Sequence, residues 1–428
     1  MHIARLKRRA FFQKGAVDVI VRKIREEEYR RVQQFCSLAF EYKVSSPEMT
    51  AEQAIQEVKA HPESSQDVHW NQWWAAFEDD DQTMMSTFIA IPYRAHFDGH
   101  DVGMIGIGGV STLPQYRRMG GIRACFEKAL PDMYEQGAAL SYLYPFSTVF
   151  YRKFGYELGC ERDLWKIRME ALPKFEAEGS FHLLEKGKDL KADIRQVYDQ
   201  FARRYNCMTL DADIEYTWVD KADPFRDCVY TYVYRAKDGT PKGVVTYKPV
   251  VDEGDRTLDC TRRFLFTDRE GFQALLHLLC RLKADHSHLL INLPTDVKID
   301  SILKEWSFGN QERRRYCHGM VRVVDAVQVL KLARMQGTGE LIIELSDEQI
   351  VQNNGRFHVR FENGKTTSVE KSEAAPDVSM TIQEFSRLIC GKHEVSEWEW
   401  LEDVKLYCDP QKAAQVFYRK PMFITCAF

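Results

Sequence analysis

The chain has 428 residues, of which 44% are hydrophobic and 29% are charged, and its formal net charge is -4. This size and composition suit a globular protein of roughly two to four domains, and the slightly acidic balance gives no electrostatic reason to bind nucleic acid. No apolar run reaches the length of about 18 residues that a membrane-spanning helix needs, so we expect no membrane insertion.

Eleven cysteines are scattered from Cys36 to Cys426 without a Cys-x-x-Cys pair. An odd, unclustered count argues against both a disulfide framework and a zinc site. Beyond His286 and His288, which we assign to the start of a strand, the histidines show no metal-ligand spacing, so we predict no metal. Free buried thiols and a basic N-terminus without the apolar core of a signal peptide lead us to expect a cytoplasmic protein.

The first third of the chain alternates between strand and helix patterns. We predict strands at 17–22, 73–78, 84–96, 102–110 and 139–144, and helices at 26–40, 124–134 and 147–154. An acidic turn, Asp79 to Asp81, is expected to be solvated, and residues 97–100 form a hairpin turn. Gly155 and Tyr156 begin a return strand.

Two further units follow. In 163–308 we predict strands at 164–167, 229–234 and 243–249, a helix at 189–205, and a strand–helix–strand run over 258–293. From 316 onward we predict helices at 325–335, 382–390 and 410–417 and strands at 340–345, 356–362, 378–381 and 421–428. Thr381 is a good N-cap for the helix that follows it.

The loop at 110–123, with the sequence VSTLPQYRRMGGIR, joins a predicted strand to a predicted helix. Gly120 and Gly121 allow backbone N–H groups to approach a ligand closely, and the positive end of the helix dipole lies at the same place. This construction predicts a pyrophosphate cradle, although a basic helix N-terminus on a solvated surface has the same composition. The loop has neither the dinucleotide-binding fingerprint nor the Gly-Lys-Ser/Thr of a P-loop.

The Arg-x-x-Gly pattern that starts at Arg117 resembles the acetyl-coenzyme A loop of the GNAT (Gcn5-related) acetyltransferases. Ile122 departs from that family's pattern, which has a small residue at this position. The resemblance implies acetyl-coenzyme A as co-substrate, with its pyrophosphate on the loop amides and its pantetheine arm along the end of the strand. The residues that it assigns to this role are Val110, Ser111, Thr112, Arg117, Arg118, Met119, Gly120, Gly121 and Ile122.

Two more segments extend the resemblance: FYRKFGY at 150–156 and the apolar end FITCAF at 423–428. With two GNAT-like units and a tail that looks like a sterol-carrier-protein module, the chain resembles the Eis (enhanced intracellular survival) acetyltransferases over nearly its whole length. This implies an α/β (α+β) fold: tandem GNAT folds with mixed, splayed sheets flanked by helices, plus a sterol-carrier-protein-like α/β domain. The implied domains are 1–160 (catalytic GNAT), 161–312 (second, degenerate GNAT-like) and 313–428 (sterol-carrier-like). The resemblance also implies a homo-oligomer, commonly a hexamer.

By this resemblance the chain is an N-acetyltransferase that moves the acetyl group of acetyl-coenzyme A directly to a primary amine. Tyr151 would be the general acid for the departing thiolate, because a phenol stays protonated near neutrality. Tyr156 is the rival, which we expect to pack in the core. The base would be the terminal carboxylate of Phe428. Ala427 stands where some relatives carry an acidic residue.

The acceptor would be a cationic amine: an aminoglycoside, a polyamine or a lysine-bearing peptide. Candidate contacts with it are Phe40, Glu41, Tyr42 and Gly109, with Trp73 and Trp74 less certain. Two other functions compete with this one. The chain could be a lipid- or hydrophobe-binding protein that uses the sterol-carrier-like module beside a non-catalytic GNAT unit, or an assembly protein without catalysis.

Overall fold

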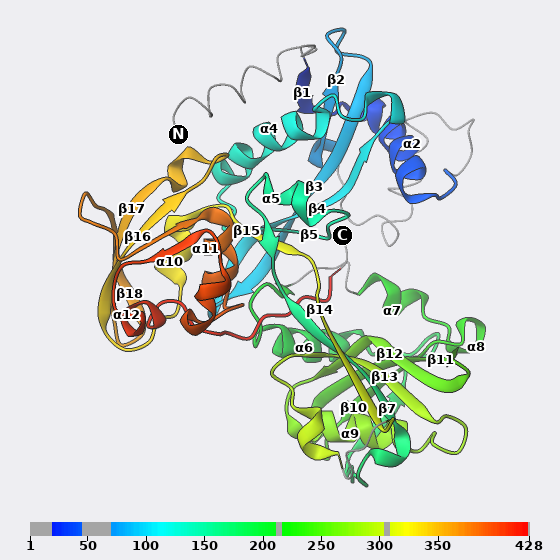
Figure 1. The fold of residues 1–428 in the computed structure, drawn as a ribbon. Helices are drawn as coiled ribbons and strands as arrows, with labels where there is room; N and C mark the ends of the chain where they lie inside the picture. Colours follow the sequence, from blue (N-terminus) through cyan, green and yellow to red (C-terminus); the bar gives the residue numbers. More distant parts are fainter. Residues whose placement is uncertain (1–18, 45–69, 211–215, 304–308, 427–428) are drawn as a thin grey trace.

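The computed structural model describes residues 19–44, 70–210, 216–303 and 309–426. Three sheets form the framework (Figure 1). The first sheet has the order β1-β2-β3-β4-β5-β15-β6. Its strands are β1 (Ile20–Lys23), β2 (Trp73–Phe77), β3 (Met84–Phe97), β4 (His100–Thr112), β5 (Leu140–Leu143), β6 (Glu157–Leu158) and β15 (Met320–Val323). The helices of this part are α2 (Tyr29–Phe40), α4 (Gly121–Glu135) and α5 (Thr148–Arg152).

The first sheet is buried on both faces, and β2 shows why its sequence is uniformly apolar. Successive side chains of a strand point to opposite faces. Trp73 therefore belongs to the core under α2, while Trp74 belongs to the core under α4. All five residues of β2 are buried. Both tryptophans, which we considered as substrate contacts, thus serve mainly the packing of the sheet.

The second sheet has the order β14-β7-β13-β12-β11-β10-β8. Its strands are β7 (Glu161–Arg168), β8 (Ser180–Leu183), β10 (Tyr230–Arg235), β11 (Pro241–Asp252), β12 (Asp255–Phe266), β13 (His288–Pro294) and β14 (Gln311–Cys317). Helices α6 (Lys191–Ala202), α7 (Thr217–Lys221), α8 (Pro224–Asp227) and α9 (Arg269–Cys280) accompany it, and β9 (Thr209–Leu210) pairs with β3 of the first sheet. Each of the two large sheets contains one parallel pair, β4–β5 and β12–β13.

The two large sheets exchange strands. β7 follows β6 of the first sheet in sequence, yet it lies in the second sheet next to β13. β15 follows β14 of the second sheet, yet it lies in the first sheet between β5 and β6. The predicted boundary between residues 312 and 313 falls inside β14. Neither large sheet is therefore built from one continuous stretch of chain.

The third sheet has the order β18-β17-β16-β19-β20 and forms the C-terminal module. Its strands are β16 (Gly339–Ser346), β17 (Gly355–Glu362), β18 (Lys365–Lys371), β19 (Val378–Thr381) and β20 (Val404–Leu406), with helices α10 (Ala326–Leu332), α11 (Ile382–Cys390) and α12 (Pro410–Ala414). The predicted mixed α/β architecture is confirmed. In the described parts of the chain, no helix is both long and apolar enough to cross a membrane.

The C-terminal segment corrects the sequence analysis. We predict a strand over 421–428, but within 421–426 the structure has only an isolated bridge between Asn206 and Met422, and the helix predicted to reach 417 ends at Ala414. The tail does not join a sheet because its carbonyl groups bind side chains of the other units. The carbonyl of Ile424 accepts from Arg162 and that of Cys426 accepts from Tyr144. Residues 427 and 428 lie outside the described residues.

Candidate active site

Pairing between β4 and β5 ends where β4 extends beyond the last residue of β5. The two strands pair in parallel from Met104 opposite Leu140 to Ile107 opposite Leu143, where β5 ends. β4 continues to Thr112, and among the described strands it pairs there only with β3. One edge of 108–112, which includes the predicted Val110, Ser111 and Thr112, is therefore available to another extended chain such as a pantetheine arm.

A bulge in β4 accompanies this opening. The register with β3 runs from Ile89 opposite Gly108 to Thr87 opposite Ser111, so β4 has one extra residue. Gly109 lies in the bulge with φ +59, and an added Cβ would approach Trp73 Cη2 to 2.6 Å. Gly109 thus shapes the backbone, as is usual for glycine in a bulge. The structure gives it no side-chain role toward an acceptor.

The predicted phosphate loop leads directly into α4, whose start carries no side-chain cap from the described parts of the chain. Arg118 and Gly120 have positive φ values of 68 and 90, and α4 starts at Gly121, three residues before the predicted 124. Gly120 is the N-cap, with no side-chain cap and no acidic residue in the first helical turn. A Cβ on Gly120 would meet no atom within 4 Å. The N-cap thus borders open space and no side chain of the described residues caps the helix, which is the condition for binding an anion.

The neighbours of Gly121 explain the second glycine. A Cβ there would lie 2.5 Å from Ser86 Oγ, and that hydroxyl shares a 2.9 Å hydrogen bond with Thr112 Oγ1. The missing side chain lets the helix end sit directly on the first residues of β3 and the last residue of β4. Ser86 is a residue that the sequence analysis misses, since a single serine within a predicted strand carries no signal of this contact.

The side chains of the loop divide between solvent and core. Arg117, Arg118 and Met119 are exposed, and neither arginine forms an ion pair with any residue that the structure describes. The Ile122 side chain is only 8% exposed and packs in the core beneath α4. Of the predicted cofactor residues, Ile122 can thus offer a ligand its backbone but not its side chain.

The equivalent helix start in the second sheet is closed. The Asp268 carboxylate accepts a hydrogen bond from the Gly271 N–H at 2.9 Å and pairs with Lys242 at 2.9 Å. A Cβ on Gly271 would lie 2.1 Å from the Lys242 carbonyl. A cavity of about 380 Å³ adjoins this helix start. The start of α9 is thus already capped from within the chain and does not leave this N–H to a phosphate.

Tyr151 lies in α5, which follows β5 and begins at the N-cap Ser147. Its ring packs edge-on against four aromatic rings, and its side chain is 2% exposed. The hydroxyl forms no hydrogen bond with any described residue, so its proton is not engaged elsewhere. Burial raises the pKa of Tyr151 well above the ordinary tyrosine value, and the neighbouring Tyr156 adds to the shift. The phenol therefore stays protonated across the neutral range.

Tyr156 differs from Tyr151 in the engagement of its hydroxyl. That hydroxyl is 2.7 Å from Ser141 Oγ, and both side chains are fully buried. Burial raises the pKa of Tyr156 to about 12. As expected, Tyr156 is a core residue with a satisfied hydroxyl, and Tyr151 is the better candidate for an acid.

The C-terminal tail is fixed where β4 and β5 separate. Tyr144 directly follows β5, and its hydroxyl donates to the carbonyl of Cys426. The preceding residues are held as well: Phe423 N–H donates to the Asn206 carbonyl at 3.1 Å, and buried Lys420 pairs with Asp98 at 2.5 Å. Phe428 itself lies outside the described residues, but it is only two residues beyond this anchor.

Three residues around this anchor were missed by the sequence analysis. His318 precedes β15 and packs its ring 4.7 Å from that of Tyr144. Burial, with the charge of Arg162, lowers the pKa of His318 to about 3, so its ring is neutral. Tyr144, Arg162 and His318 lie far apart in sequence and share no motif, so only the fold brings them together.

The predicted acceptor residues lie at the end of α2. Phe40 and Tyr42 are 56% and 47% exposed, and Glu41 adopts the left-handed conformation that ends the helix. The structure brings Tyr42 to the β4 bulge, because Tyr42 and Ser111 both interact with the Cys36 thiol. Phe40 and Glu41 are not brought into this contact.

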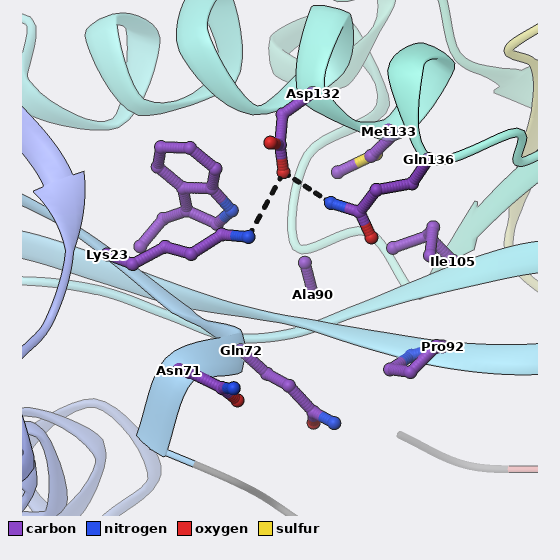
Figure 2. A pocket seen from close by; sticks show the side chains of 10 residues that line it. Lys23, Asn71, Gln72, Ala90, Pro92, Ile105, Asp132, Met133 and Gln136 are labelled. Atoms are coloured by element: carbon purple, nitrogen blue, oxygen red, sulfur yellow. Dashed lines mark hydrogen bonds and ion pairs between the residues drawn. The ribbon is translucent and has the colours of Figure 1, made fainter.

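A second cavity, of about 240 Å³, lies between the last turns of α4 and the sheet (Figure 2). Asp132 accepts there from Lys23 at 3.3 Å and from Gln136 at 2.5 Å, so these polar groups satisfy one another. It lies at the end of α4 opposite to Gly120 and is separate from the phosphate loop. In the described ranges, no group of three or more His, Cys, Asp or Glu side chains is arranged to hold a metal ion.

Comparison with protein families identifies two regions. Residues 20–159 match the family model of an acetyltransferase (GNAT) domain, and residues 323–424 match that of a sterol carrier protein domain. A comparison with curated protein sequences gives no significant match.

Several solved structures share the fold over almost the whole chain. A protein of Enterococcus faecalis V583 described as a probable N-acyltransferase is 21% identical with a TM-score of 0.78, and the match covers 96% of this chain and 100% of that one. A GCN5-related N-acetyltransferase of Anabaena variabilis is 18% identical with a TM-score of 0.79, covering 95% and 99%. Eis1 of Mycobacterium abscessus is 16% identical with a TM-score of 0.77, covering 96% and 100%.

The chain thus contains a GNAT acetyltransferase domain, and its class is that of the acetyl-coenzyme A-dependent N-acetyltransferases. A sterol carrier protein domain follows at its C-terminal end. In domain order and overall fold the chain is Eis-like, and the resemblance predicted from its sequence is confirmed at that level.

Proposed function

We propose that this protein transfers the acetyl group of acetyl-coenzyme A directly to a primary amine of a cationic acceptor, with Tyr151 as general acid and the terminal carboxylate of Phe428 as base. The observation that carries the proposal is the uncapped start of α4 beside the open end of β4. A diphosphate at this helix start would place a pantetheine arm along 108–112.

Acetyl-coenzyme A fits the residues at this place. Gly120 leaves open space in front of the first helical N–H groups, and Arg117 and Arg118 lie exposed beside them. These groups would bind the diphosphate by hydrogen bonds and charge. The free backbone edge of β4 would hold the pantetheine amides and could polarise the thioester carbonyl, as an oxyanion hole does.

Two properties of Tyr151 support its role as the general acid. Its hydroxyl is unengaged among the described residues, and its raised pKa keeps the proton in place. As the amine attacks the thioester carbon, the C–S bond breaks, and the thiolate sulfur takes the phenolic proton or a hydrogen bond from it.

The base assignment rests on the tail. Cys426, two residues before the terminus, is fixed by Tyr144 at the end of β5, which supports a terminal carboxylate near the opening between β4 and β5. A carboxylate delivered there would attract the ammonium of an acceptor and accept its proton, directly or through water. Neutral His318 nearby adds no competing positive charge.

The acceptor class would follow from such a carboxylate and from the aromatic side chain of Tyr42. Tyr42 lies near the β4 bulge with its side chain about half exposed, and an aromatic ring of this kind would attract a cation. Polyamines, aminoglycosides and lysine side chains all present ammonium groups of this kind.

The test is a screen for coenzyme A release with spermidine, kanamycin and a lysine-bearing peptide as separate acceptors. We expect acetyl-coenzyme A-dependent thiol release with at least one of them, together with a rise in melting temperature on adding coenzyme A. A protein that coenzyme A does not stabilise, and that releases no thiol with any of the three, would contradict the proposal. Stabilisation by a fatty acid instead would favour lipid binding.

A further inference from the structure

The C-terminal module contacts α5 at the end opposite to its N-cap. Gln383, in the first turn of α11, donates from its side-chain amide to the Arg152 carbonyl at 2.8 Å. Gln349, which follows β16, donates in the same way to the Lys153 carbonyl at 3.4 Å. Arg152 is the last residue of α5 and Lys153 is its C-cap, and carbonyls at a helix end lack a partner within the helix. The Arg152 carbonyl also accepts from the Gly155 N–H of the following turn, at 3.1 Å.

A buried ion pair reinforces this contact. Arg322 of β15 and Asp347 of the C-terminal module are both fully buried, and Nη2 of the arginine lies 2.8 and 2.9 Å from the two carboxylate oxygens. The backbone N–H of Ile350 and the amide of Asn353 also donate to this carboxylate, at 3.1 and 2.9 Å. The position of the guanidinium is therefore set by the C-terminal module.

The guanidinium fills the space left by Gly155. A Cβ on Gly155 would lie 1.5 Å from Nη1 of Arg322, and Gly155 has φ +83. This glycine ends the turn after α5, and Tyr151 precedes it by four residues. Ile382 of α11 closes the same space, since its Cγ2 would lie 3.0 Å from that Cβ. The glycine of the FYRKFGY segment is thus required by a side chain that the C-terminal module holds.

We propose that the C-terminal module positions α5, so that Gln383 and the Arg322–Asp347 pair set the orientation of Tyr151. A five-residue helix has too few internal hydrogen bonds to fix its own direction. The N-cap Ser147 holds one end of α5, and the module holds the other. The inference rests on the proposed function in one respect, the assignment of Tyr151 as the acid. It assigns the sterol-carrier-like module a positioning role in which no lipid takes part.

The test is a double-mutant cycle between Gln383 and Tyr151 in the full-length protein. Gln383→Leu keeps the side-chain size but removes the donor. We expect kcat to fall about tenfold, with the KM for acetyl-coenzyme A changed less than about twofold, because only the acid is displaced. Gln383→Lys retains a donor and should recover most of the turnover. In a Tyr151→Phe background, Gln383→Leu should cause no further loss, since the group that it positions is absent.

The matched control is Gln415→Leu, since the Gln415 amide donates to the Thr338 carbonyl within the module at 3.5 Å and does not reach α5. Its turnover should equal that of the wild type. An unchanged kcat in Gln383→Leu, or an equal loss in both Tyr151 backgrounds, would overturn the positioning role while leaving the proposed function intact. Full turnover in Tyr151→Phe alone would instead remove the acid assignment. Thermal melts of every variant verify that the fold is retained.

Discussion

Tyr151 and Tyr156 form a matched pair that separates catalysis from stability. In Tyr151→Phe the ring contacts with Phe126, Phe146 and Phe150 remain, and the lost hydroxyl has no hydrogen-bond partner among the described residues. We therefore expect the free energy of unfolding to change by less than about 0.5 kcal/mol. Turnover should fall by roughly 10² to 10⁴, the usual contribution of a general acid.

Tyr156→Phe should behave in the opposite way. It breaks the buried 2.7 Å contact with Ser141, although Ser141 still donates to the Ile105 carbonyl at 2.8 Å. A buried hydrogen bond of this kind contributes about 1 kcal/mol, so the variant should melt earlier but keep turnover within a few-fold of the wild type. Thiol release from acetyl-coenzyme A and thermal unfolding measure the two effects.

The pH profile adds an independent check. Burial raises the pKa of Tyr151 above its usual value of about 10. The acid form is the active one, so its loss should reduce kcat/KM only above pH of about 10. A basic limb below pH 9 that disappears in Tyr151→Phe would refute this reasoning. Unchanged turnover in Tyr151→Phe would also refute it. The same holds if Tyr156→Phe, and not Tyr151→Phe, is the inactive variant.

Two other substitutions and one C-terminal extension test the site and its surroundings. Gly121→Ala places a Cβ 2.5 Å from Ser86 Oγ, so we expect about 1 to 2 kcal/mol lower stability and weaker coenzyme A binding, measured by melting and calorimetry; a variant as stable as the wild type would contradict this packing. Burial alone would raise the pKa of Glu157, but the hydrogen bonds from Arg152 and the Leu158 N–H, together with the nearby arginine charges, outweigh it and leave that pKa below its usual value. Glu157→Gln should therefore be about 1 kcal/mol less stable than the wild type at pH 7. Urea titrations should show this difference in the free energy of unfolding shrinking as the pH falls below about 4.5. An equal difference at pH 7 and pH 4 would contradict this role of Glu157. Two residues added after Phe428 should abolish turnover but leave coenzyme A binding unchanged, and wild-type turnover in the extended protein would exclude the terminal carboxylate.

Local patterns in the sequence predict most of the elements near the site. The strand predicted at 84–96, the hairpin turn at 97–100 and the helix predicted at 26–40 correspond to β3, the β3–β4 turn and α2, which begins three residues later than predicted. Ser147 and Thr381 are N-caps whose side chains accept from the backbone three residues on, at Phe150 and Glu384. These features depend on residues within about one helical turn, which is why the sequence alone indicates them.

The pairings between distant segments could not be predicted in this way. β15 enters the first sheet between strands that lie more than 150 residues earlier, and nothing in the sequence of 320–323 indicates its partners. The tail is a second example. Its apolar sequence is typical of a strand, but side chains of Tyr144 and Arg162 fix it instead of backbone pairing with a neighbouring strand. In both cases the deciding contacts are non-local.

The two helix starts explain in physical terms why the first sheet has a candidate cofactor site and the second sheet does not. Both helices follow the first strand of the parallel pair in their sheet. In both, the first N–H groups have no acceptor within the helix. At α4 the loop supplies glycines and arginines but no acceptor, so a ligand must accept from the N–H groups. At α9 the carboxylate of Asp268 is the acceptor. Asp268 alone does not close the second site, because the backbone of Lys242 occupies the space next to Gly271. The start of α9 therefore differs from a phosphate cradle in both charge and shape, and a single substitution at Asp268 would not create one.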